Sequence, residues 1–183
     1  SRLKMPTNLE NTMAKTTPRV VLVTGAAGGI GRAMVASLLS AGHRIAALDY
    51  DAKGLNALMA EHGSHPNLYT IEADLSTANG CEAGMAAAVA HFGGVEAVVN
   101  NAGIGVSSLR PDAETRLPSL EELSAAVWDR FFAINVTAPM LLTRAAVPMM
   151  RAAGWGRIIN NTTSFRTMLR VLPYGATKAA LEA

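Results

Sequence analysis

Two residues near the end of the sequence have the types and spacing for acid/base chemistry: Tyr174 and Lys178 stand four apart. On a helix, side chains at i and i+4 share one face. A phenol has a pKa of roughly 10, too high for a general base near neutrality, and a nearby ammonium lowers that pKa by favouring the phenolate. The pair could take a proton from an alcohol or return one to a carbonyl. Taken alone, the spacing is weak evidence, because such pairs also occur by chance.

A glycine-rich segment near the other end could bind a diphosphate. The short β-branched run 20–23 is typical of a strand covered on both faces, and it leads into TGAAGGIG at 24–31. Glycines between a strand and a helix allow backbone N–H groups and the helix N-terminus to face phosphate oxygens. Gly25, Gly29 and Gly31 have the spacing G-x-x-x-G-x-G. The alternative is a tight turn without a ligand, which the position after the first strand disfavours.

Two carboxylates follow the next two predicted strands. Asp49 ends the second strand, where it could accept hydrogen bonds from the ribose diol of an adenosine. A carboxylate there repels a 2′-phosphate, and no Lys or Arg interrupts the glycine-rich segment, so the sequence favours NAD over NADP. Asp74 follows the third strand and could orient an adenine amino group. The alternatives are a solvated strand-end carboxylate for Asp49 and a helix cap for Asp74.

Alternating strands and helices must position these groups. The predicted strands are 20–23, 44–48, 68–72, 95–99 and 157–161, and the predicted helices are 32–40, 52–61, 81–92, 120–151 and one starting at 174. Breaks in the long helix are expected near Ser124 and at Pro139 or Pro148. Short buried strands alternating with helices predict an α/β fold with a doubly wound parallel sheet in a three-layer α/β/α arrangement. Ligands of such sheets bind at the carboxyl ends of the strands, where all of these polar groups occur.

Composition indicates one globular domain and excludes several classes of protein. Of 183 residues, 50% are hydrophobic and 16% are charged, with a net charge of +2. Residues 1–18 are predicted to be a disordered tail that precedes a domain over 19–183. The sequence contains no basic run of the kind that predicts nucleic-acid binding. No apolar run approaches the roughly twenty residues that span a membrane. Scattered histidines and the single Cys81 predict neither a metal site nor an internal disulfide, and the protein is expected to be cytoplasmic.

Several motifs together resemble the classical subgroup of the short-chain dehydrogenase/reductase family. TGAAGGIG, Asp74, NNAG at 100–103, Asn135 within FFAINVT, the hydroxyl cluster after strand five and YGATK at 174–178 occur in that family's order. Each motif is weak by itself, but together they cover nearly everything from Val20 to the end. The resemblance implies a Rossmann fold and hydride transfer with a nicotinamide dinucleotide.

The resemblance also implies roles for individual residues. The diphosphate, adenosine and ribose would be held by Thr24, Gly25, Gly29, Ile30, Gly31, Asp49, Asp74, Leu75, Asn101, Ala102 and Gly103. Tyr174 would be the acid/base, and Lys178 would bind the nicotinamide ribose and lower the Tyr174 pKa. Asn135 would hold a water that links Lys178 to solvent. A helix-kink amide is a compatible alternative for Asn135, since opening a helix creates a water site.

The sequence departs from the family pattern in two places. The substrate-binding hydroxyl after strand five would come from Thr163, with Ser164 as the alternative, because a threonine can replace the usual serine. Family members also continue past the Tyr/Lys helix with further strands and a mobile substrate loop. These C-terminal strands are absent here, which indicates a fragment, a shortened sequence or an unusual truncated member.

The two loops at 104–120 and 164–173 should flank a small-molecule substrate, a secondary alcohol or ketone such as a 3-oxoacyl compound. Their arginines are Arg110, Arg116, Arg166 and Arg170. Arg166 or Arg170 could read an acidic substrate, and solvated loop arginines are the alternative. The resemblance implies a homodimer or homotetramer. Two other functions stay open: an NAD-binding regulator or scaffold with impaired catalysis, and an unrelated Rossmann protein such as a methyltransferase.

Overall fold

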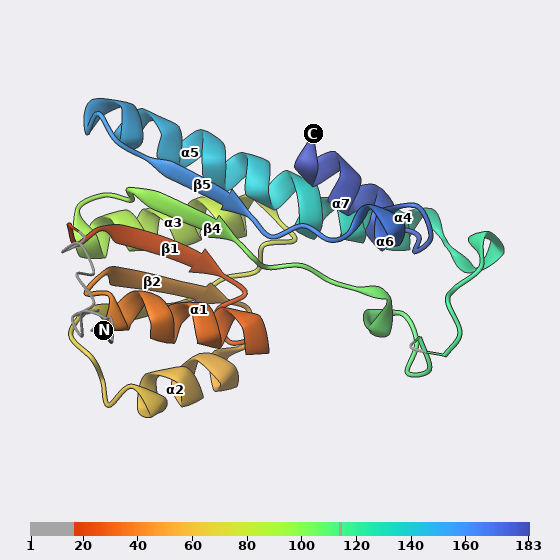
Figure 1. Ribbon diagram of the computed structural model, residues 1–183, viewed down its shortest axis with the longest axis horizontal. Coiled ribbons are helices and arrows are strands. Elements are labelled where there is room, and N and C mark those ends of the chain that lie inside the picture. Colours follow the sequence, from red (N-terminus) through yellow and green to blue (C-terminus); the bar gives the residue numbers. More distant parts are fainter. Residues whose placement is uncertain (1–16, 114) are drawn as a thin grey trace, which may run out of the picture.

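The computed structural model describes residues 17–113 and 115–183; most of the predicted tail lies outside them. Five parallel strands form one sheet in the order β3-β2-β1-β4-β5 (Figure 1). Their bounds are β1 Val20–Thr24, β2 Arg44–Asp49, β3 Leu68–Glu72, β4 Ala97–Asn100 and β5 Arg157–Asn160. The chain moves outward from β1 to β3 and then returns to place β4 on the other side of β1. The predicted doubly wound parallel sheet is confirmed, and its strand order reverses beside β1, where such folds bind ligands.

Helices cover both faces of the sheet (Figure 1). One face carries α1 (Gly29–Ser40) and α2 (Ala52–Glu61), and the other carries α3 (Ala78–Phe92) and α5 (Ala138–Ala152). Because side chains alternate along a strand, Leu22 packs with α3 and α5 whereas its neighbours Val21 and Val23 pack with α1 and α2. The two apolar clusters give the three-layer core, and they explain why the strands are continuously apolar.

The predicted helix over 120–151 is divided into several elements. A 3-10 turn at Leu120–Glu122 precedes α4 (Ala125–Phe132), whose first turn is capped by the Ser124 hydroxyl at 3.3 Å from the Val127 N–H. A π-helical turn, Ala133–Thr137, joins α4 to α5. The predicted break at Ser124 is confirmed, and the second interruption falls just before Pro139. The suggested break at Pro148 is wrong, because α5 continues through it.

The helical run Ala125–Ala152, of 28 residues, also meets the length and composition criteria for crossing a membrane, since an 18-residue window in it has a mean hydropathy of 1.3. The sequence analysis overlooked it because charged residues interrupt its apolar stretches. On this run, Leu142, Ala146 and Met150 are buried in the core cluster that includes α3. Core helices meet the same criteria, so length and composition are weak evidence for a span.

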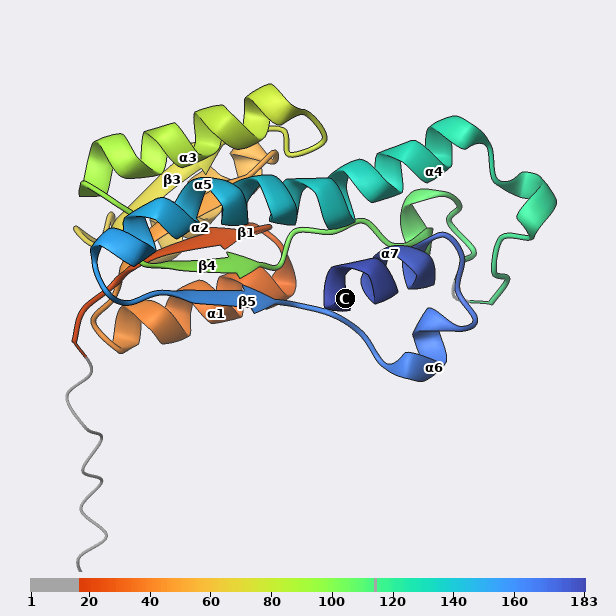
Figure 2. The ribbon, with the colours of Figure 1, turned by 90° about the horizontal axis from the view of Figure 1, so that it is seen from above.

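Two further helices lie beyond the carboxyl ends of the strands (Figure 2). The short α6 (Phe165–Met168) lies within the predicted loop after β5, and α7 (Tyr174–Glu182) carries the Tyr/Lys pair. The sequence did not predict α6, since four residues are too few to show a helical period. Gly175 permits the packing of these helices: a Cβ there would collide with the Met168 carbonyl.

Candidate active site

A cleft of about 1190 Å³ lies at the carboxyl ends of the strands. It is lined by most of the site residues expected from the sequence: Gly25, Gly29, Ile30, Gly31, Asp49, Asp74, Leu75, Asn101, Ala102, Gly103, Tyr174 and Lys178. Thr24, Asn135, Thr163 and Ser164 do not line it. The cleft therefore joins the glycine-rich segment and the Tyr/Lys pair, which are about 150 residues apart in the chain.

The glycine-rich turn is shaped by close backbone approaches. Gly25 has φ +64°, and a Cβ on it would lie 2.8 Å from the Ala102 Cα. A Cβ on Gly31 would collide with the Gly25 carbonyl and lie 2.8 Å from the Ala26 Cα. These two positions therefore require glycine. A Cβ on Gly29 would meet nothing within 4 Å, so Gly29 instead keeps the cleft side of α1 open.

Asp49 holds the glycine-rich turn and also faces the cleft. Its side chain is buried, and its Oδ2 accepts the Ala27 N–H at 2.9 Å while Oδ1 accepts the Asp51 N–H at 3.1 Å. Each carboxylate oxygen can accept more than one hydrogen bond. The carboxylate is thus fixed in direction and keeps acceptor capacity for a ribose diol, so its interpretation as a freely solvated strand-end group is wrong.

Asp74 lines the cleft, but it does not cap the next helix. The Ser76 N–H donates to Asp74 Oδ1 at 2.9 Å, and hydrogen bonds from Ser76 hold the pKa of this carboxyl below its usual value. The cap of α3 is Thr77, whose hydroxyl accepts the Gly80 N–H at 3.0 Å. The cap alternative for Asp74 is therefore wrong, and an ionised carboxylate stays at this end of the cleft.

Thr24 forms hydrogen bonds within the protein, whereas the sequence predicts that it contacts a diphosphate. Its buried hydroxyl donates to the Val99 carbonyl at 3.2 Å and accepts the N–H groups of Asn101 and Ala102, each at 3.0 Å. This corrects the expected role. Thr24 positions the segment after β4, and the Asn101 amide in turn donates to the Gly25 carbonyl at 3.2 Å.

Asn161 connects the glycine-rich turn to Lys178, and the sequence analysis missed it. Its amide donates to Asn101 Oδ1 at 2.9 Å, and its backbone carbonyl accepts the Lys178 ammonium at 2.7 Å. A signal existed, because two adjacent parallel strands both end in Asn-Asn. Asn100 pairs with Asn160 in the sheet register, with their side chains 2.8 Å apart, which brings the following asparagines together.

Tyr174 and Lys178 share one face of α7, as the spacing predicts. The Lys178 Nζ lies 5.7 Å from the centroid of the Tyr174 ring, and its side chain is 3% exposed. Burial lowers the pKa of Lys178, while the hydrogen bond to the Asn161 carbonyl favours the charged form. The ammonium is therefore close enough to act on the phenol electrostatically without contacting the hydroxyl directly.

Asn135 lies in the π-helical turn and is fully buried. Its amide donates to the Ile104 carbonyl at 3.0 Å and to the Thr177 hydroxyl at 2.9 Å, and its Oδ1 accepts the Ile104 N–H at 2.9 Å. Both donors are thus used within the protein, while Oδ1 keeps one lone pair. A Cβ on Gly103 would lie 3.2 Å from this oxygen and 3.5 Å from the Lys178 Nζ, so both groups face the same space.

The two candidates for the substrate-binding hydroxyl differ in their surroundings. Ser164 caps α6: its hydroxyl accepts the Thr167 N–H at 3.3 Å and lies 3.0 Å from the Thr167 hydroxyl. Ser164 therefore has a structural role that competes with substrate binding. Thr163 is half-buried two positions after Asn161, and the geometry favours it of the two.

Other lining residues were not anticipated. Arg130 and Ile134, on α4 and the π-helical turn, extend the cleft wall, and Ser108 contributes from the loop after β4. Arg130 contributes to the low pKa of Asp74. No group of three or more His, Cys, Asp or Glu side chains that could hold a metal occurs within the described ranges.

Comparison with known proteins identifies the family. The sequence model of the short chain dehydrogenase family matches residues 19–183. D-threitol dehydrogenase from Mycolicibacterium smegmatis is 36% identical over 151 residues, which are 82% of this chain and 54% of that protein. The chain belongs to the short chain dehydrogenase family, and this excludes the methyltransferase alternative. It spans about half the length of this curated relative.

Solved structures of the family have the same fold. A metagenomic short-chain oxidoreductase in complex with NADP is 31% identical with a TM-score of 0.77, covering 92% of this chain and 74% of that one. The 3-ketoacyl-(acyl-carrier-protein) reductase from Brucella melitensis, complexed with NADH, is 28% identical with a TM-score of 0.74, covering 88% and 64%. Both contain a nicotinamide dinucleotide, one phosphorylated and one not.

Proposed function

We propose that the protein interconverts a secondary alcohol and a ketone by hydride transfer with NAD, acting on a small carbonyl compound such as a 3-oxoacyl substrate. The observation that carries this proposal is the shared cleft. Its walls include the glycine-rich turn and Asp49 on one side and Tyr174 with Lys178 on the other. The names of the family's members support oxidoreduction at an alcohol or ketone carbon.

The cleft fits a dinucleotide along its length. The N-terminus of α1 lines the cleft and is open at Gly29, so its backbone N–H groups would face a diphosphate. Asp49 would accept hydrogen bonds from the adenosine ribose, and its charge opposes a 2′-phosphate, which supports NAD over NADP. Asp74 and Leu75 would contact the adenine.

The bound nicotinamide supplies the hydride acceptor or donor, and the protein moves the proton. Tyr174 accepts the proton of the alcohol, or returns it to the ketone, at its phenolic oxygen. Lys178 favours the phenolate by its charge and is held in place by the Asn161 carbonyl. Asn135 Oδ1 faces the space beside Lys178, where a water would continue the proton path, and Thr163 would donate a hydrogen bond to the substrate oxygen.

One observation favours a second function, an NAD-binding regulator or scaffold with impaired turnover. Neither Thr163 nor Ser164 lines the cleft, so both candidates for the substrate-binding hydroxyl lie outside its walls. A dinucleotide would still bind, because the glycine-rich turn and Asp49 do not depend on these hydroxyls. The two functions therefore differ in turnover and agree in cofactor binding.

An NADH titration followed by an alcohol panel separates these functions. Saturable NADH binding, with NADPH binding at least tenfold weaker, is expected for both. Turnover of a secondary alcohol that falls by about 10²–10⁴-fold in Tyr174→Phe supports the dehydrogenase, since acid/base catalysis contributes a factor of this size. Binding without Tyr174-dependent turnover supports the regulator. A folded protein that binds neither dinucleotide would contradict both.

We further propose a homodimer or homotetramer that operates in the cytoplasm. In α5, the large apolar side chain of Met140 is 51% exposed. A second copy packed on that helix would bury this side chain. Sedimentation of the wild type and of Met140→Glu tests the contact, since a charge at its centre should shift the protein toward monomer.

A further inference from the structure

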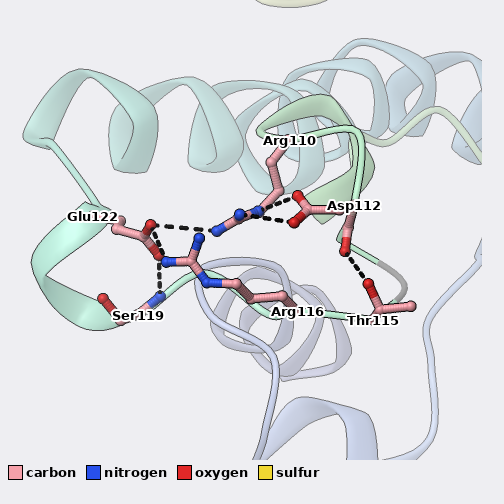
Figure 3. A network of polar contacts seen from close by, with 6 residues as sticks. All are labelled: Arg110, Asp112, Thr115, Arg116, Ser119 and Glu122. Carbon is pink, nitrogen blue, oxygen red and sulfur yellow. Dashed lines mark hydrogen bonds and ion pairs between the residues drawn. The ribbon is translucent and has the colours of Figure 1, made fainter.

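Four arginines on the two loops beside the cleft divide into two pairs. Arg110 and Arg116 take part in an ion-pair network between β4 and α4 (Figure 3). The Arg110 guanidinium binds both carboxylate oxygens of Asp112, at 2.5 and 2.9 Å, and lies 3.3 Å from Glu122, which also binds Arg116 at 2.6 Å. The charges of these two arginines are therefore already matched by acidic partners.

The second pair, Arg166 and Arg170, has no such partner in the part of the chain that the structure describes. Across residues 17–113 and 115–183, no ion pair involves either guanidinium. Both line a second cavity of about 500 Å³, together with Leu117, Thr167 and Val171. Arg166 and Arg170 are four residues apart on α6 and the turn after it, which explains why they reach the same space. Two arginines therefore line the same cavity, and no carboxylate of the described residues is paired with either.

The surroundings of this cavity are apolar. Several large hydrophobic side chains on the same two loops are exposed: Leu117, Leu120, Phe165, Leu169 and Leu172. Phe165 and Leu169 are 73% and 70% exposed and flank Arg166 on α6. An exposed apolar group of this kind commonly marks a binding surface. A fitting ligand would therefore combine an anionic group with an apolar stretch.

The cavity lies close to the proposed acid/base. The Val171 carbonyl accepts the Gly175 N–H at 2.5 Å, so the turn carrying Arg170 runs directly into α7. Tyr174 is four positions after Arg170, and a chain of that length spans at most about 14 Å between the two Cα atoms. One ligand could extend from the Tyr174 hydroxyl to the arginine pair.

We propose that Arg166 and Arg170 form an anion-binding subsite for a substrate whose carboxylate or phosphate is separated from its reacting carbon by an apolar stretch. This inference rests on the proposed function, because it assigns one end of the substrate to the same site. Guanidinium groups suit both anions, since their planar forks bind carboxylate and phosphate oxygens in pairs. The shared ligand chemistry is an anion joined to a short alkyl chain.

The test measures binding directly, with hexanoate, hexyl phosphate and hexan-1-ol as probes of the full chain by calorimetric titration. At least one anionic probe should bind at least tenfold more tightly than the alcohol, and its affinity should fall with added salt. The preferred anion distinguishes a carboxylate substrate from a phosphate. Equal binding of the three probes, or no binding of either anion, would overturn the proposal.

Variants assign the binding to these arginines. Arg166→Ala and Arg170→Ala should each weaken binding of the preferred anion about tenfold. Arg170→Lys should retain part of the affinity, because lysine keeps the positive charge but lacks the planar guanidinium that binds two oxygens at once. Arg144→Ala is the matched control: it removes an equal charge from an exposed position on α5. An equal loss in the control would show that net charge alone attracts the anion. NADH affinity, measured in every variant, should be unchanged, which keeps this test separate from that of the proposed function.

Discussion

The cleft and the loops beside it hold their polar groups in different ways. In the cleft, hydrogen bonds join residues far apart in the sequence: Asn161 binds Asn101 across 60 positions, and Asn135 binds Thr177 across 42. In the loop network, Arg110 binds Asp112 two positions away and Arg116 binds Glu122 six away. The cleft is therefore part of the tertiary fold, whereas the loop network is local and exposed. Changes in the cleft should cost stability as well as binding, and changes in the loops should leave the fold intact.

The largest effect is expected for Gly31→Ala. Its Cβ would collide with the Gly25 carbonyl, so α1 must move away from the turn. We expect a loss of about 3 kcal/mol or more in the free energy of unfolding, as for overpacked sites, together with loss of NADH binding. Gly29→Ala is the matched control, since its Cβ meets nothing within 4 Å. Urea unfolding should show wild-type stability for Gly29→Ala; an equal loss in both variants would contradict this account.

A somewhat smaller loss is expected for Asn135→Leu. The change removes the three hydrogen bonds of a fully buried amide and leaves the Ile104 N–H and carbonyl without these partners. Each buried unsatisfied group costs about 1–3 kcal/mol, so we expect a total of about 2–3 kcal/mol after relaxation. Thr177→Val removes one of the three bonds and should cost less. If Asn135→Leu unfolds at the wild-type urea midpoint, the hydrogen bonds of Asn135 do not stabilise the fold.

Asn161 and Asn101 should be energetically coupled. Asn161→Leu removes the bond between their side chains and keeps the backbone carbonyl that binds Lys178. We expect a loss of about 1–2 kcal/mol and a coupling of about 1 kcal/mol in the double-mutant cycle with Asn101→Leu. NADH affinity should fall in the same variants, because Asn101 also holds the Gly25 carbonyl. Strict additivity of the two single changes would show that the link is not made in solution.

Lys178 should give the protein a distinct pH dependence. Burial lowers its pKa below the ordinary value of 10.5. At pH values between the lowered pKa of the folded protein and the ordinary pKa of the unfolded chain, the unfolded chain binds a proton that the folded protein lacks. The free energy of unfolding therefore falls as the pH falls through this range. The difference in unfolding free energy between the wild type and Lys178→Met should therefore rise with pH up to 10.5. Urea unfolding at a series of pH values measures this difference, and a flat profile would mean that the amine is not buried in solution.

The smallest effect is expected for Glu122→Gln in the loop network. The variant loses its ion pairs to Arg110 and Arg116, but exposed pairs contribute little and are screened by salt. The urea midpoint and NADH affinity should both stay at the wild-type values. A loss as large as that of Asn161→Leu would show that the loop network is coupled to the cleft, against the contrast drawn above.

Much of the fold and of the cleft could be predicted from the sequence, because local patterns carried the information. Apolar runs marked the strands, and TGAAGGIG and the strand-end aspartates marked the cleft. The failures were of two kinds. The short α6 has too few residues to produce a period, whereas the irregularity expected at Asn135 is present as the π-helical turn. The hydrogen bonds of Thr24 to the segment after β4 could not be predicted, because a hydroxyl's partner depends on which backbone groups the fold brings within reach.

The sequence by itself determined the alternation of strands and helices, the family, and the presence of a phenol and an amine on one helical face. Those features depend on residues near one another in the chain, where periodicity and motif spacing apply directly. The tertiary structure alone decided that Lys178 binds Asn161 and that Asn161 binds Asn101. It also decided that, among residues 17–113 and 115–183, Arg110 and Arg116 form ion pairs while Arg166 and Arg170 form none. A hydrogen bond or ion pair requires two groups within about 3–4 Å, and for groups far apart in the chain only the packed fold sets that distance.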